Sequence, residues 1–125
     1  MNFEDITNRL ASLGYAYDEQ RDSWILGFLI DKVTNHICNN CNLSEIPTGL
    51  YEKAVDVVCA EFIKGVYSQN KGLIDVDSAV TSIREGDTTV NFASGSTPEE
   101  IYLKYLDTLV SDTIDFARYR KMNWN

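Results

Sequence analysis

The sequence has no apolar run long enough to cross a membrane. Its longest apolar stretch, Trp24–Ile30, is interrupted by Gly27, whereas a membrane-spanning helix needs about 20 mostly apolar residues. The opening residues, MNFEDITNRL, carry acids where a secretion signal carries bases. We therefore expect a protein that is made in the cytoplasm and has no membrane partner.

Positive charge is also scarce, because 11 bases face 19 acids and the formal net charge is −8. Binding nucleic acid by neutralising its phosphates requires a basic face, so general nucleic-acid binding is disfavoured. The bases are nevertheless unevenly placed, since Arg118, Arg120 and Lys121 fall together and no acid follows Asp115. Residues 118–125 are therefore predicted to form a basic, aromatic tail that either packs on its own chain or docks on an acidic partner.

Paired cysteines are missing, because the chain has only three: Cys38, Cys41 and Cys59. An odd number in a cytoplasmic chain argues against a disulfide framework. His36, Cys38 and Cys41 are spaced like part of a metal or redox site, but structural zinc requires four ligands. The other interpretation is that these cysteines are small apolar residues near a helix end, packing against Cys59. A zinc or redox role stays open as the minor alternative.

Signatures of catalysis are scarce as well. No glycine-rich loop follows a strand, and the single histidine has no serine or cysteine partner that the sequence can place. Acid pairs such as Glu99-Glu100 lie in the first turns of predicted helices, where the helix dipole favours negative charge. Without a convergent set of catalytic groups, we predict that the chain is not an enzyme and uses no cofactor.

The residues that are present indicate one all-α domain spanning 1–125. Composition is ordinary for a folded chain, with 44% hydrophobic and 24% charged residues. Apolar side chains recur at helical spacing and predict a small four-helix bundle-like domain. The predicted helices cover about 3–13, Asp18 to near Asn39–Asn42, 48–69 with the fewest polar positions, and Thr97 to about Tyr119. A helical turn or two is also expected around Val76, Val80 and Ile83.

The second of these helices carries a broad apolar stripe. Ile25, Leu29, Val33 and Ile37 share one side, and Trp24, Phe28 and Cys41 widen it. An apolar stripe of this kind is the side that a helix turns toward the core.

Residues 84–97, between the third and fourth helices, do not fit a helix. Thr88, Thr89, Val90 and Phe92 favour an extended backbone, yet a lone strand has no partner and is not stable. The segment is thus predicted to be a long extended loop or short strand, mobile in the isolated chain. Its hydrogen bonds come either from another molecule or from weak packing on its own subunit, since long loops are usually functional or disordered.

Three stretches resemble one known family. They are IPxGL at 46–50 after Cys41-Asn42, AVxSIxEGDTTVxF at 79–92, and DFAxYRxxxW at 115–124. In order and spacing they resemble the head–tail connector proteins of tailed bacteriophages and of prophages in Gram-positive bacteria. Residues 94–96, Ser-Gly-Ser, are similar to the small-residue linker that precedes the last helix in that family. The resemblance spans almost the whole chain, although no single stretch is diagnostic.

The resemblance implies a structural subunit of the virion, at the head–tail interface. Such subunits are made in the host bacterial cytoplasm and form a homo-oligomeric ring beneath the portal protein. The ring extends the DNA channel and provides the platform for the head-completion, stopper or tail protein, while DNA passes without sequence-specific binding. An acidic wall suits such a channel, because it repels phosphate.

The same resemblance suggests roles for two sets of residues. The extended segment would contact the neighbouring subunit of the ring, by strand addition or along its helices, through Gly86, Asp87, Thr88, Thr89, Val90, Phe92 and Gly95. The tail would contact the portal or another partner through Arg118, Tyr119, Arg120, Lys121 and Trp124. The alternative function is a small acidic prophage-encoded adaptor that binds a host regulatory protein.

Overall fold

The computed structural model describes residues 1–86, 96–111 and 116–119. Within these ranges the chain is helical apart from its connectors, and its one extended pairing is a single bridge between Tyr15 and Ile74. The all-α class predicted from the sequence is therefore confirmed. None of the described helices is both long and apolar enough to span a membrane.

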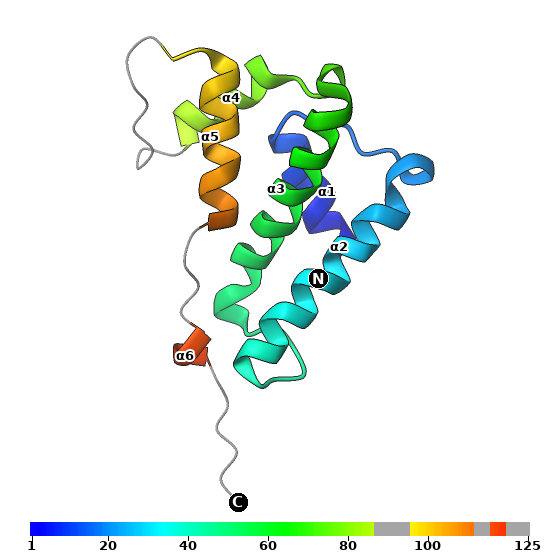
Figure 1. The fold of residues 1–125 in the computed structure, drawn as a ribbon, viewed down its shortest axis with the longest axis vertical. Coiled ribbons are helices and arrows are strands. Elements are labelled where there is room, and N and C mark those ends of the chain that lie inside the picture. Colours follow the sequence, from blue (N-terminus) through cyan, green and yellow to red (C-terminus); the bar gives the residue numbers. More distant parts are fainter. Residues whose placement is uncertain (87–95, 112–115, 120–125) are drawn as a thin grey trace, which may run out of the picture.

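The helices follow one another in the order shown in Figure 1. Their bounds are α1 Phe3–Ser12, α2 Glu19–Cys41, α3 Tyr51–Asn70, α4 Val76–Gly86, α5 Pro98–Ser111 and α6 Phe116–Tyr119, with 3-10 turns η1 Thr48–Leu50 and η2 Lys71–Leu73.

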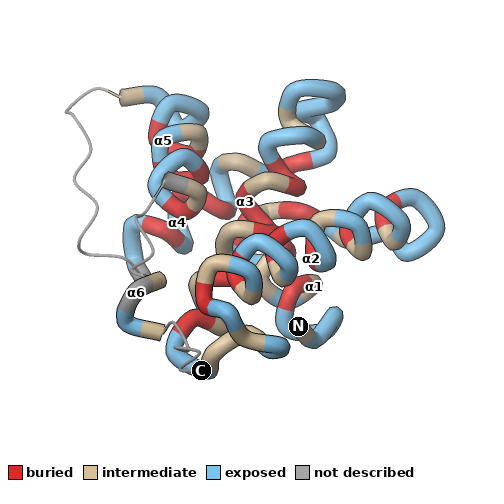
Figure 2. Tube along the Cα trace, turned by 60° about the horizontal axis from the view of Figure 1, so that its bottom comes forward, coloured by how far each residue is buried: buried red, intermediate tan, exposed pale blue. Residues whose placement is uncertain are grey.

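Helix α3 is the centre of the fold, as its low polarity predicted. It packs against α1, α2 and α5, while α4 packs against α5 and α6 against α2. In Figure 1, α3 runs between α5 on one side and α2 on the other, and in Figure 2 the buried residues gather around it. Its core side chains are Ala54, Val55, Val58, Cys59, Ala60, Phe62 and Ile63.

The ends of the helices lie close to where the sequence places them. Asp18 caps α2 by accepting hydrogen bonds from the backbone N–H groups of Gln20 and Arg21. Asn42 ends the same helix in the left-handed conformation, with φ at 54°. Thr97 caps α5, because its hydroxyl accepts from the N–H of Glu100 at 3.2 Å. Short polar side chains thus satisfy backbone groups that a helix end leaves unpaired.

Helix α4 is longer than predicted and shortens the extended segment. The expected turn or two is an 11-residue helix that reaches Gly86, so residues 84–86 are helical and do not belong to the extended segment 84–97. Ala79, Val80 and Ile83 are buried. Burial of this apolar side stabilises a helix that short-range sequence signals alone predict weakly. The remainder, residues 87–95, lies outside the described part of the chain.

The predicted orientation of α2 was correct at Val33, Ile37 and Cys41 and wrong in the N-terminal half of the helix. The buried residues are Asp22, Leu26, Ile30, Val33, Ile37 and Cys41. By contrast, Trp24, Ile25 and Phe28 are 76%, 49% and 57% exposed. Because residues 24–30 are apolar apart from Gly27, several helical phases fit this stretch equally well. Packing against α3 selects the phase that includes Leu26. The first buried residue of that phase is Asp22, so the apolar pattern does not show where the buried side begins.

Candidate protein-interaction surface

The side of α2 that faces away from α3 carries an exposed aromatic pair. The rings of Trp24 and Phe28 stack on the helix surface, with centroids 5.8 Å apart and planes 13° apart. At 100° per residue, six residues between positions 20 and 35 share this side. They are Gln20, Trp24, Gly27, Phe28, Asp31 and Asn35, which we call the outer stripe; all are exposed except half-buried Gly27. It contains one charged residue, and few charges with exposed aromatics are typical of the centre of a protein interface.

A groove runs beside the outer stripe, between α2 and α3. Two cavities of about 340 and 410 Å³ adjoin along it and share Glu61 in their linings. On the α2 side the linings extend from Arg21 to Ile37, a rise of about 24 Å along the helix. The α3 side contributes Val57, Glu61, Phe62, Gly65, Val66, Gln69 and Asn70. A groove of this length and lining is suited to about four turns of an amphipathic helix.

A buried polar network fixes the N-terminal end of α2. The Asp22 carboxylate is 5% exposed. It accepts hydrogen bonds from the Tyr15 hydroxyl at 2.6 Å, the Asp18 N–H at 3.0 Å and Arg21 Nε at 3.1 Å. Burial alone would raise the pKa of Asp22, but these hydrogen bonds outweigh it and the pKa is lowered. The carboxylate therefore stays charged and holds α2 to the preceding connector.

The same network has the opposite effect on Tyr15. Burial and the hydrogen bond to Asp22 raise the pKa of its phenol, and Arg21 only partly offsets them. The Tyr15 ring also packs edge-on against Phe62 of α3, with centroids 5.3 Å apart. These hydrogen bonds and the ring contact therefore hold the N-terminal end of α2 against α3 and so position the outer stripe.

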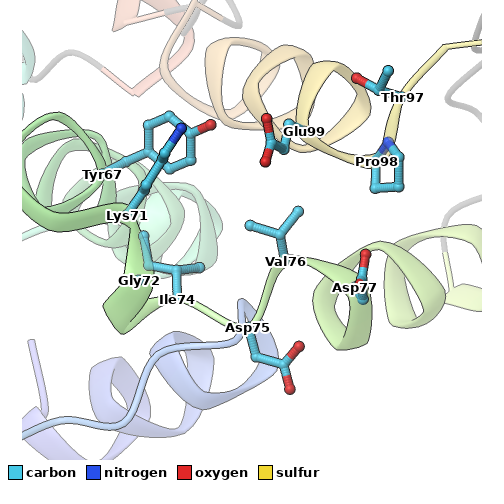
Figure 3. Close-up of a pocket in the computed structure, with 10 residues that line it drawn as sticks. All are labelled: Tyr67, Lys71, Gly72, Ile74, Asp75, Val76, Asp77, Thr97, Pro98 and Glu99. Atoms are coloured by element: carbon cyan, nitrogen blue, oxygen red, sulfur yellow. The ribbon is translucent and has the colours of Figure 1, made fainter.

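A third cavity, of about 670 Å³, lies where α3, α4 and α5 meet. In Figure 3, Tyr67 and Lys71 lie across the space from Val76 and Glu99. The Asp75 carboxylate accepts a hydrogen bond from the Ser78 N–H at 3.2 Å, so it caps α4. The lining is a mixture of apolar, acidic and basic groups, and we find no nucleophile–base pair in it that would indicate catalysis.

Within the described part of the chain, the cysteines are not gathered with other possible metal ligands. No group of three or more potential ligands comes together among the residues that the structure describes. Cys38 is half-buried, Cys41 is buried, and Cys59 is buried with its thiol 3.6 Å from the Ile6 carbonyl oxygen. Burial raises the pKa of Cys59 to about 12, so this thiol remains protonated and unreactive near neutral pH. The described geometry favours the packing interpretation.

Most of the site residues suggested by the sequence lie outside the described ranges. Gly86 is the last residue of α4, and Asp87, Thr88, Thr89, Val90, Phe92 and Gly95 fall in 87–95. Of the tail, Arg118 is exposed on α6 and Tyr119 is half-buried. Arg120, Lys121 and Trp124 lie beyond the last described residue. Only Gly86, Arg118 and Tyr119 of this set fall in the described part of the chain, and the proposed roles remain predictions.

Helix α6 attaches the C-terminal region to the body. Phe116 contacts His36 of α2 edge-on, with ring centroids 5.7 Å apart. Tyr119 packs so closely on Gly49 that a Cβ atom at Gly49 would lie 2.6 Å from the Tyr119 hydroxyl oxygen. Gly49 therefore leaves room for the Tyr119 ring. The contact connects η1, just before α3, with the last described residue of the chain.

Sequence reasoning missed the outer stripe because it assigned Trp24 and Phe28 to the core. One signal was available: a core stripe built on Leu26 continues through Ile30, Val33, Ile37 and Cys41 with regular spacing. Comparison of the chain with protein-family models, with curated proteins and with solved structures finds no match.

Proposed function

We propose that this chain is a structural subunit of a phage head–tail connector ring. In this role it docks beneath the portal in virion assembly, extends the DNA channel and gives the stopper or tail protein its platform. Three resembling stretches support the proposal, and the observation that carries it is a contact between two of them. Tyr119 of the third stretch packs on Gly49 of the first, so two of the resembling stretches meet in the fold.

Other features agree with a subunit that works through protein contacts. The outer stripe offers an aromatic, charge-poor surface to a partner. The net charge of −8 suits a channel through which DNA slides. In the ring, residues 86–95 contact the next subunit and the basic tail contacts the portal.

Light scattering of the purified chain, alone and with a portal protein, tests the connector role. We expect a closed ring on the portal, visible by electron microscopy, and a variant lacking residues 87–95 that keeps its helical circular dichroism but forms no ring. Gly65→Ala, on the exposed side of α3, is the matched control and assembles normally. If the full chain forms no ring with any portal tested, the connector role is wrong.

The α2–α3 groove favours a second candidate, an acidic adaptor that binds a helix of a host regulatory protein. This function predicts a stable monomer or dimer that does not bind the portal. It binds an amphipathic helix in the groove, and deletion of residues 87–95 does not affect that binding. Gly65→Trp, which would fill the groove beside Val66 and Phe62, abolishes target binding under this function and leaves portal binding intact under the first.

A further inference from the structure

The outer stripe of α2 has a chemical symmetry. Around a point between Gly27 and Phe28, the residues of the stripe fall into equidistant pairs along the helix. Gln20 mirrors Asn35, Trp24 mirrors Asp31, and Gly27 mirrors Phe28. Each pair is complementary: two side-chain amides, an indole N–H donor with a carboxylate acceptor, and a large ring with a position that has no side chain.

Gly27 has no explanation within its own chain. A glycine inside a helix costs about 1 kcal/mol relative to alanine. A Cβ atom at Gly27 would meet nothing within 4 Å, so the fold does not require the gap. A missing side chain on an exposed helix does permit close approach by another molecule, and the aromatic pair beside it marks the place.

We propose that two copies of the chain pair through their outer stripes, with the two α2 helices antiparallel. The two-fold axis passes between Gly27 and Phe28, so that Phe28 of each copy covers Gly27 of the other. In this register Trp24 donates to Asp31 of the second copy, and Gln20 lies opposite Asn35. One patch meets itself, which is the ordinary geometry of a closed homodimer.

The size of the surface sets the strength of the pair. Trp24 and Phe28 are 76% and 57% exposed, which corresponds to roughly 300 Å² of ring surface. A stable interface buries about 800 Å² on each partner. With the smaller contributions of the other residues of the stripe, the pair is weak and reversible. It belongs to the free chain and does not depend on the proposed connector function.

The first test measures self-association of the full chain by sedimentation across a range of concentrations. Gly27→Leu places a side chain where Phe28 of the second copy would lie, and we expect it to raise the dimer dissociation constant by about 30-fold or more. Gly65→Leu is the matched control, because Gly65 is also an open helical glycine but lies off the stripe. It leaves the dimer unchanged.

Circular dichroism checks that both variants keep their helices, which the higher helix propensity of leucine favours. A wild-type chain that stays monomeric at its highest soluble concentration would overturn the proposal. So would a Gly27→Leu variant that dimerises as strongly as the wild type. Self-association of the wild type into rings with no dimer would also overturn it. Portal-seeded assembly of Gly27→Leu is scored separately, so that failure of the pair and failure of the connector role are distinguished.

The second test reads the orientation of the helices by cysteine cross-linking in a Cys38→Ser background. The double variant Gln20→Cys with Asn35→Cys should give disulfide-linked dimers, because the two positions face each other. Each single variant should not, since like positions would be separated by about 22 Å along the paired helices. Efficient cross-linking in either single variant, or none in the double variant, would contradict the antiparallel register.

Discussion

At the scale of single residues, Asp22 shows how a charge becomes part of a core. It is the one buried charged or polar residue among the described side chains, and three donors satisfy its carboxylate. An unpaired buried charge would be strongly destabilising, whereas a charge with several hydrogen bonds fixes local geometry. The network therefore reinforces, at the N-terminal end of α2, the orientation that packing against α3 selects.

Replacing Asp22 should destabilise the fold in a pH-dependent way. Asp22→Ala leaves the Tyr15 hydroxyl and the Asp18 N–H without their acceptor, and we expect a loss of about 3 kcal/mol at pH 7 by urea denaturation. Because the folded pKa of Asp22 is lowered, its contribution is complete above the ordinary carboxylate pKa of about 4 and is lost as the pH falls. The gap between variant and wild type should therefore close in acid.

A control separates the network from a general charge effect. Glu45 is exposed in the connector after α2, so Glu45→Ala should change the stability by less than about 0.5 kcal/mol. A gap between wild type and Asp22→Ala that is the same at every pH would show that the carboxylate's charge is not what stabilises this corner.

At the scale of elements, helix ends were easier to predict than helix faces. Caps such as Asp18, Asn42 and Thr97 act on backbone groups a few residues away, so the local sequence specifies them. The side of α2 that is buried depends on α3, which is distant in sequence. In a stretch as apolar as 24–30, local periodicity gives no unique phase, and only the continuation of the Leu26 stripe to Cys41 indicated which side is exposed. Helix α4 was underestimated for the same reason.

Two glycines in different elements should respond to alanine in opposite ways. Gly65 lies inside α3 and a Cβ there meets nothing within 4 Å, so Gly65→Ala should stabilise by about 0.5–1 kcal/mol. Gly14 has φ at 82°, and a Cβ there would collide with the Asp75 backbone carbonyl. Gly14→Ala should destabilise by about 2 kcal/mol or more.

Thermal melting checks both signs, with roughly 4 °C expected per kcal/mol in a domain of this size. If Gly14→Ala melted like wild type, the connector between α1 and α2 would have to be free to move away from Asp75. A lower melting temperature for Gly65→Ala would mean that a side chain at position 65 disturbs the wall of the α2–α3 groove.

At the scale of the whole molecule, contacts from far along the chain hold α1 in place. Arg9 of α1 donates to Asp56 of α3 at 2.8 Å and to the Tyr105 hydroxyl of α5 at 2.9 Å. The Asp75 N–H donates to the Gly14 carbonyl oxygen at 2.8 Å. These contacts join residues 47 to 96 positions apart in the sequence, so the described body should unfold as one cooperative unit.

Helix α6 gives a prediction about the whole chain, because its attachment depends on Gly49. Gly49→Ala should push the Tyr119 ring from its place and speed tryptic cleavage after Arg118 several-fold, with the cleavage followed by mass spectrometry. Tyr119→Ala should speed cleavage similarly, and the double variant should add little, because both changes break one contact. Gly72→Ala is the control; equal rates in Gly49→Ala and the control would refute the role of this contact.

Three of the seven tyrosines are buried, Tyr15, Tyr102 and Tyr105, and the phenol pKa is raised in the first two. Tyr15 donates to Asp22, and Tyr102 donates to the Leu13 carbonyl oxygen. Burial comes first among the causes that raise both phenol pKa values, so both rings should become phenolate at a higher pH than exposed tyrosines do. In alkaline titration, ultraviolet absorbance should therefore rise in two steps, with the later step coinciding with loss of structure. Tyrosine absorbance alone should therefore report alkaline unfolding, with no dye or label required.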